Sequence, residues 1–172
     1  MNAAPSNRPA NAPTGSAGVV FQWPVRVYWE DTDAGGIVFY ANYLKFFERA
    51  RTEWLRSLGL EQQRLRDQLG GMFVVTDTQV RYQRPARLDD LLLVTAELSD
   101  AGRASLTIRQ SASLRPAPAA PLPAEGPGAP SDEAAPALLL CEGSIRIGWV
   151  DAATLRPQRI PIHLLDALQA LR

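Results

Sequence analysis

Two aspartates and two glycines lie close together near the start of the chain, in the run EDTDAGG from Glu30 to Gly36. A carboxylate can act as a general base on water, or it can attack an acyl carbon itself. Glycine has no side chain, so backbone N–H groups beside it can approach a ligand closely. An amphipathic helix is expected soon after this run, and N–H groups at a helix start favour developing negative charge. This combination suits chemistry at a carbonyl group.

Other interpretations of these aspartates have to be weighed. Aspartate often caps a helix or a turn, and residue types alone do not separate that role from catalysis. Calcium binding is disfavoured, because an EF-hand loop would need a side-chain oxygen where Gly35 stands and a glutamate where Asn42 stands. With one Cys and one His, the chain also lacks the ligands of a zinc cluster. We therefore expect no metal and no cofactor.

The composition is that of an ordinary globular protein. The length of 172 residues predicts one domain, and 46% of the residues are hydrophobic and 21% charged. A formal net charge of zero gives no general attraction to nucleic acid or to an anionic membrane. No apolar run approaches the roughly 20 residues that span a bilayer, so no integral membrane segment is expected. The single cysteine, Cys141, favours a buried structural role and a reducing, cytoplasmic location.

Hydrophobic periodicity predicts the elements that position the aspartates. Alternating side chains indicate a strand over Val25–Trp29, with Pro24 tolerated at its start. Over Asn42–Leu58, apolar residues recur every three or four positions, which predicts a long amphipathic helix that stops at Gly59. A second, shorter helix is expected over Glu61–Leu69.

Strand patterns dominate the rest of the chain. The turn residues Asp100 to Gly102 predict a hairpin between two of these strands. The strands are expected at Met72–Tyr82, Leu91–Ser99, Arg103–Leu114 and Leu138–Val150, and a short helix at Pro161–Arg172. One long helix followed by a run of strands predicts an α+β fold, in which the helix packs on one face of an antiparallel sheet.

Two segments rich in proline and alanine are expected to lie outside the core. Residues 1–20 have few large apolar groups, which predicts a disordered tail. Proline in about residues 115–137 disfavours both helix and sheet pairing, so we expect a long loop inserted in a single domain over residues 21–172. The remaining core of roughly 130 residues is thin, and we expect it to pair into a homodimer or homotetramer.

The aromatic and charged residues of the long helix are given structural roles. Phe46, Phe47 and Trp54 are expected to pack in the core rather than to line an acyl pocket. Glu48 and Arg51 are expected to be solvated or paired rather than to face a substrate channel.

A resemblance to a known family is carried by two runs, VRVYWEDTDAGGIVFYANYLKFFERARTEWLR and RYQRPARLDDLLLV. They resemble the 4-hydroxybenzoyl-CoA thioesterase family of the hotdog fold, and are most similar to its Tol-Pal system-associated acyl-CoA thioesterases. The resemblance covers about residues 24–114 and, more weakly, 140–160. It implies a five-stranded antiparallel sheet wrapped around one long central helix, and dimers whose sites lie at the interface.

The resemblance also implies an acyl-CoA thioesterase, a hydrolase that cleaves the thioester of its substrate. The family's catalytic carboxylate matches Asp33, and the backbone N–H that polarises the thioester carbonyl matches Tyr40. Gly36 lies in the same loop and is expected, with Ile37, to contact the substrate. Asp31 would support the loop. Coenzyme A would arrive as part of the substrate, and acyl carrier protein is the other thioester carrier considered.

Two departures from the family pattern affect these expectations. The Tol-Pal branch commonly carries His where this chain has Tyr40, so any help from that side chain would not carry over, although the backbone N–H would. The inserted segment is also longer than the family hairpin requires. Two other functions stay open. A hotdog dehydratase would need a catalytic His, which this stretch lacks, and a non-enzymatic partner would bind acyl-thioesters or acyl carrier protein beside the Tol-Pal envelope system.

Overall fold

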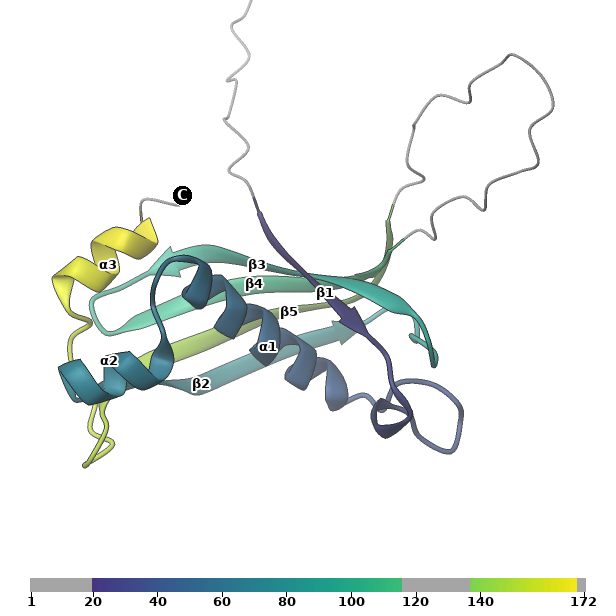
Figure 1. Ribbon diagram of the computed structural model, residues 1–172, viewed down its shortest axis with the longest axis horizontal. Helices are drawn as coiled ribbons and strands as arrows, with labels where there is room; N and C mark the ends of the chain where they lie inside the picture. The colour runs from purple at the N-terminus through teal and green to yellow at the C-terminus, as the bar shows by residue number, and fades with distance from the viewer. Residues whose placement is uncertain (1–19, 116–136, 170–172) are drawn as a thin grey trace, which may run out of the picture.

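The computed structural model describes residues 20–115 and 137–169. One antiparallel sheet of five strands, in the order β1-β3-β4-β5-β2, carries the long helix α1 across one face (Figure 1). The strands are β1 (Phe21–Arg26), β2 (Gly71–Tyr82), β3 (Leu91–Ala101), β4 (Ser105–Leu114) and β5 (Leu138–Asp151). The helices are α1 (Asn42–Ser57), α2 (Gln62–Leu69), α3 (Ile162–Gln169) and a single 3-10 turn, η1 (Trp29–Asp31). The predicted α+β fold is confirmed; the predicted tail and insertion lie almost entirely outside the described residues.

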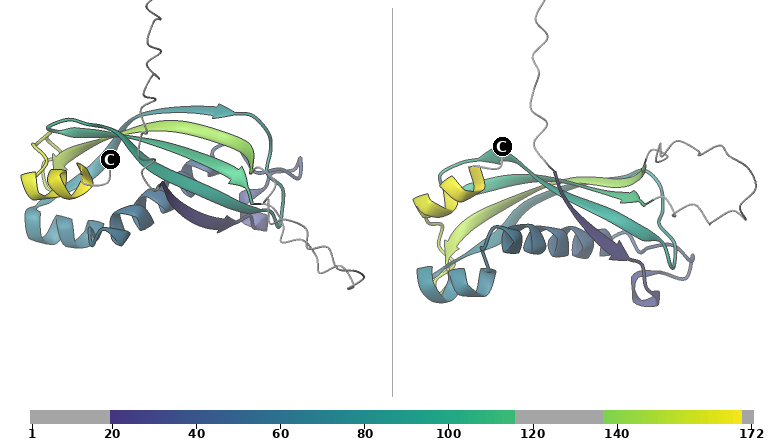
Figure 2. Two further views of the ribbon diagram at one scale, coloured as in Figure 1. Left: turned by 90° about the horizontal axis from the view of Figure 1, so that it is seen from above. Right: turned by 45° about the horizontal axis from the view of Figure 1, so that its top comes forward.

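The helix α1 buries one face against the concave side of the sheet. Figure 2 shows the sheet curving around α1, with α3 at the end of the sheet remote from the start of α1. The buried apolar residues of α1 are at most 4% exposed: Tyr43, Phe46, Phe47, Ala50, Trp54 and Leu55. Each large side chain buried in this way contributes roughly 1.5–3 kcal/mol. The predicted core role of Phe46, Phe47 and Trp54 is confirmed.

The sequence pattern misplaced the first strand. It was expected over Val25–Trp29, whereas β1 ends at Arg26 and Trp29 belongs to η1. Pro24 lies inside the strand, paired with Leu93, and not at its start. An edge strand accommodates proline because its open side makes no ladder hydrogen bonds, and among the described strands β1 pairs with β3 alone. The early end of β1 leaves Asp31 at the end of η1 and Asp33 in the loop that follows.

Gly71 starts β2 directly beneath the indole of Trp149. A Cβ atom at this position would lie 2.3 Å from Cζ2 and 2.4 Å from Cε2 of that ring. Trp149 is itself 2% exposed, and its ring meets that of Phe73 edge-on at a centroid distance of 4.9 Å. The ring is therefore held in place, and only glycine fits beneath it.

We predict that Gly71→Ala lowers the free energy of unfolding by about 1–3 kcal/mol, because the added methyl group overpacks the core at Trp149. Denaturant unfolding followed by tryptophan fluorescence would measure the loss. Gly102→Ala is the matched control, since its Cβ would meet Ser105 at an ordinary 3.4 Å. Equal stability of Gly71→Ala and the parent protein would contradict the prediction.

Candidate active site

Residues 32–38 form a short loop that backbone hydrogen bonds close at its base. The N–H of Asp33 donates to the carbonyl of Ile37 at 2.9 Å, and the N–H of Gly36 donates to the carbonyl of Asp33 at 3.0 Å. Gly36 has a φ of +72°, in the left-handed region that favours glycine. The turn therefore depends on glycine at this position.

The carboxylate of Asp33 is exposed and only partly engaged. Its Oδ1 accepts the N–H of Gly35 at 2.8 Å, which orients the side chain as in an Asx turn. A Cβ atom on Gly35 would lie 3.0 Å from Oδ1, so the glycine leaves room for the carboxylate. Within the described part of the chain, Oδ2 makes no hydrogen bond. One oxygen thus holds the group, while the other is open to water or substrate.

Asp31, two residues earlier, has the opposite environment. It is 1% exposed, and its Oδ2 accepts the N–H of Tyr28 at 3.0 Å. Its backbone carbonyl accepts two further hydrogen bonds, from the N–H of Phe39 at 2.9 Å and from Nδ2 of Asn42 at 3.0 Å. Asp31 therefore ties the loop to the start of α1, which agrees with the support role expected for it.

Tyr40 lies in the turn that leads into α1, two residues before Asn42. The carbonyl of Phe39 accepts the N–H of Asn42 at 2.8 Å, and the carbonyl of Tyr40 accepts the hydroxyl of Tyr82 at 3.0 Å. Among the described residues, the N–H of Tyr40 has no acceptor. In a trans peptide the N–H points opposite to the preceding carbonyl, so this N–H points away from the hydrogen bond that Phe39 makes with Asn42. Such a donor suits an oxyanion.

The four residues predicted to form the site thus belong to one loop and the turn after it. Ile37 is half-buried and forms an isolated antiparallel bridge with Arg87. The next residue, Val38, donates its N–H to the carbonyl of Ala86 at 2.9 Å. The segment that follows β2 therefore fixes the loop from a second side.

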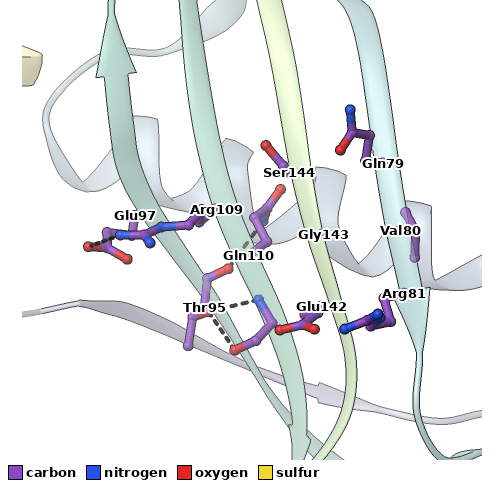
Figure 3. Close-up of a pocket in the computed structure, with 11 residues that line it drawn as sticks. Gln79, Val80, Arg81, Thr95, Glu97, Arg109, Gln110, Glu142, Gly143 and Ser144 are labelled. Carbon is purple, nitrogen blue, oxygen red and sulfur yellow. Dashed lines mark hydrogen bonds and ion pairs between the residues drawn. The ribbon is translucent and has the colours of Figure 1, made fainter.

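One hollow lies on the face of the sheet opposite to α1 (Figure 3). It has a volume of about 620 Å³ and is lined by polar side chains of four strands. There Arg109 pairs with Glu97 at 3.3 Å, and the hydroxyls of Thr95 and Ser111 lie 2.9 Å apart. Opposite charges and hydroxyls on one face are typical of an antiparallel sheet with a solvated side, and we assign this hollow no ligand.

Two smaller hollows lie between α1 and β2. Their volumes are about 460 and 200 Å³, and both are lined by Glu48, Arg51 and Val75. Neither has Asp33 or Tyr40 in its lining. The candidate carboxylate and these hollows are therefore separate within one copy of the chain.

Gln110 is a buried polar residue that the sequence did not single out. It is 3% exposed, and its Nε2 donates to the carbonyl of Phe47 at 2.9 Å and to that of Thr95 at 3.2 Å. Its Oε1 accepts a hydrogen bond from Nη1 of Arg51 at 2.7 Å. Burial lowers the pKa of the Arg51 guanidinium. Arg51 is thus paired, as expected for a charged residue on this helix, but its partner lies in β4.

Cys141 is fully buried in β5, and burial raises the pKa of its thiol to about 12. A protonated, inaccessible thiol is a poor nucleophile, so the predicted structural role is confirmed.

Over residues 20–115 and 137–169, no cluster of three or more His, Cys, Asp and Glu side chains could hold a metal ion. No helix in the same ranges is both long and apolar enough to cross a membrane.

Comparison with known proteins adds independent evidence. A family model described as the thioesterase superfamily matches residues 35–115. The chain is 36% identical over 152 residues to the acyl-CoA thioesterase YbgC of Haemophilus influenzae, which covers 88% of this chain and 96% of that protein. It is 50% identical over 91 residues to the acyl-CoA thioester hydrolase YbgC of Escherichia coli, covering 53% and 67% of the two chains. The crystal structure of a probable thioesterase from Bartonella henselae superposes with a TM-score of 0.62 at 27% identity, covering 83% and 98%.

The five-stranded antiparallel sheet wrapped around one long helix, taken with these relatives, defines a thioester hydrolase of the hotdog fold. The chain belongs to the thioesterase superfamily. The resemblance stated from the two sequence runs is confirmed, and the relatives above include the YbgC acyl-CoA thioesterases.

We predict that Asp31→Ala lowers the free energy of unfolding by about 1–3 kcal/mol, because the N–H of Tyr28 loses its acceptor beside a buried position. Thermal unfolding followed by circular dichroism would measure the loss. Asp33→Ala removes the same group from an exposed position and is expected to cost less than about 1 kcal/mol. Similar losses in the two variants would contradict the division between a supporting and an exposed aspartate.

Proposed function

We propose that this chain hydrolyses the thioester bond of acyl-CoA substrates, with Asp33 as general base or nucleophile and the Tyr40 N–H as oxyanion donor. One observation carries the proposal: within residues 20–115 and 137–169, a carboxylate oxygen of Asp33 and the N–H of Tyr40 have no hydrogen-bond partner, and both belong to the same short segment before α1. The names of the relatives from Haemophilus influenzae and Escherichia coli support coenzyme A as the carrier. Acyl carrier protein is the alternative carrier, because it also holds acyl groups as thioesters.

Two routes to the products use the same groups. In the first, the Asp33 carboxylate removes a proton from water, and the water oxygen attacks the thioester carbonyl. In the second, the carboxylate attacks the carbonyl itself, and water then hydrolyses the resulting anhydride. In both routes the carbonyl oxygen becomes an oxyanion that the Tyr40 N–H receives, and the C–S bond breaks as it collapses. The released thiolate takes up a proton, which leaves a carboxylic acid and coenzyme A.

Gly36 and Ile37 are proposed to contact the substrate. The N–H of Gly36 already donates to the carbonyl of Asp33. Gly36 would therefore leave room for the substrate rather than donate a hydrogen bond to it. Apart from Gly36 itself and its two chain neighbours, no described residue has an atom within 4 Å of the point where a Cβ atom on Gly36 would stand. A substrate can therefore approach the backbone closely at this point.

A second copy of the chain is proposed to complete the site. The 12-residue strand β2 lies at an edge of the sheet, and no other described strand pairs with its outer side. Long open edges pair readily with another strand. Leu44 and Val75, which line a hollow between α1 and β2, are 40% and 54% exposed. Antiparallel pairing of two β2 strands would cover this apolar surface in a homodimer.

The same pairing would explain why the carboxylate and the hollows are separate in one copy. The Tyr82 end of β2 lies beside the start of α1, since the rings of Tyr43 and Tyr82 are 5.7 Å apart. In an antiparallel pair, that end would meet the Gly71 end of the second copy. Asp33 of one copy would then face the hollows between α1 and β2 of the other. A homotetramer would arise if two such dimers associate.

We also propose a cytoplasmic location for the protein. A cytoplasmic location rests on the single, buried cysteine, which fits a reducing compartment. A non-enzymatic role beside the Tol-Pal system is the competing function, and the relatives described as hydrolases favour the enzyme.

We predict that the purified protein releases free thiol from at least one member of a panel of acyl-CoAs of short, medium, long and aryl type, and that Asp33→Asn lowers kcat at least about 100-fold. Asparagine keeps the shape of the side chain but is neither base nor nucleophile. Glu97→Gln, on the solvated face, makes the same chemical change and should keep full activity. Undiminished thiol release by Asp33→Asn would refute the mechanism. No release from any acyl-CoA or acyl carrier protein thioester would favour the binding role.

We predict that Val75→Glu raises the dissociation constant of the dimer at least about tenfold, because pairing would bury an unpaired charge. Sedimentation equilibrium would measure the constant. Ile162→Glu places the same charge on α3, where the parent side chain is 69% exposed, and should leave the dimer intact. A parent protein that is fully active as a monomer would contradict the proposed shared site.

A further inference from the structure

Tyr82 ends β2, and its phenol reaches the turn before α1. The hydroxyl donates a hydrogen bond to the carbonyl of Tyr40 at 3.0 Å. The rings of Tyr82 and Tyr40 meet edge-on, with centroids 6.2 Å apart, and Tyr43 supports Tyr82 from its other side at 5.7 Å. Burial raises the pKa of the Tyr82 hydroxyl, so the group stays protonated and able to donate at neutral pH.

The carbonyl of Tyr40 lacks the partner that a regular helix would give it. In an α-helix this carbonyl would accept the N–H of Leu44, four residues later. That N–H instead donates to the carbonyl of Ala41 at 3.1 Å. Tyr40 precedes the first residue of α1, so the helix supplies no N–H to its carbonyl, and the donor that this carbonyl accepts among the described residues is the Tyr82 hydroxyl. A side chain from the sheet, rather than the helix itself, fixes the orientation of this peptide.

The peptide on the other side of the Tyr40 Cα is also held. It consists of the Phe39 carbonyl and the Tyr40 N–H, and its carbonyl accepts the N–H of Asn42 at 2.8 Å. Asn42 is anchored in turn, because its Nδ2 donates to the carbonyl of Asp31 at 3.0 Å. With both flanking peptides held, the torsions at Tyr40 are fixed, and so is the direction of its N–H.

We propose that Tyr82 is a positioning residue for the oxyanion donor: its hydroxyl holds the Tyr40 carbonyl so that the Tyr40 N–H stays aimed at the reacting carbonyl. This inference rests on the proposed function. Tyr82 acts through Tyr40 and exchanges no proton with the substrate. A donor that is already oriented receives charge in the transition state without reorganising, and misplacing a catalytic group by about 1 Å can cost about 100-fold in rate.

Tyr82→Phe tests the inference, because it keeps the ring and removes only the hydroxyl. We expect kcat to fall about tenfold while KM changes less than about twofold, the signature of an interaction realised in the transition state. The melting temperature should stay within about 2 °C of the parent value, since one exposed hydrogen bond contributes little to stability. Tyr28→Phe is the matched control, since its parent ring is 60% exposed and its hydrogen bonds with Asp31 are made by its backbone N–H and carbonyl. It should leave kcat and KM unchanged.

A second measurement reads the orientation of Tyr40 without any substrate. The chain has four tyrosines, so labelling with ¹⁵N-tyrosine gives a four-peak amide spectrum that single variants assign. In Tyr82→Phe the Tyr40 amide peak should shift, or broaden through motion on the microsecond to millisecond timescale. The Tyr28 peak should stay in place.

The outcomes separate this inference from the proposed function. Full activity of Tyr82→Phe beside an inactive Asp33→Asn would overturn the positioning role alone. If kcat and the melting temperature of Tyr82→Phe both fall, the positioning role is also overturned, because that pattern marks a structural residue. If Asp33→Asn stays fully active, the proposed function fails, and the Tyr40 amide peak alone decides whether Tyr82 orients this peptide. An unmoved peak would refute the hydrogen bond as an orienting contact.

Discussion

The packing of α1 against the sheet is the constraint on which the site depends. Phe46 and Phe47 are fully buried, and a Cβ atom on Gly143 of β5 would lie only 3.0 Å from Cε2 of Phe47. At this distance the helix can neither slide nor rotate without opening a cavity or a clash. The first residues of α1 are fixed as a result. Asn42, the first of them, holds the segment before the loop in place through its hydrogen bond to the carbonyl of Asp31.

The loop shows how one residue type can serve two purposes within three positions. Asp31 is buried, and both its carboxylate and its carbonyl are used by the backbone and by Asn42. Asp33 is exposed, and only one of its oxygens is engaged, by the N–H of Gly35. The first aspartate holds the backbone in place, and the second leaves one carboxylate oxygen unengaged among the described residues. Residue type therefore says less about role here than burial and hydrogen-bond partners do.

Local pattern predicted most of the fold, because α1 and the strands β2 to β5 carry strong 3.6- or 2-residue periodicities. The first strand was misplaced because its edge position, which tolerates Pro24, is a property of the sheet and not of the segment. The glycines and the exposed Asp33 could be found from spacing. The contact between Tyr82 and Tyr40 could not, since it joins residues 42 positions apart, and the partner of Gln110 depends equally on tertiary packing.

Cys141 gives the protein a reporter of its own motions. It is the only thiol in the chain, and it is fully buried in β5, a strand with neighbours on both sides. A thiol reagent can reach it only when the central strands open, so its alkylation rate under native conditions measures the free energy of that opening. No probe has to be introduced and no residue near Asp33 is altered. The transient opening of the sheet can thus be followed in the unmodified chain.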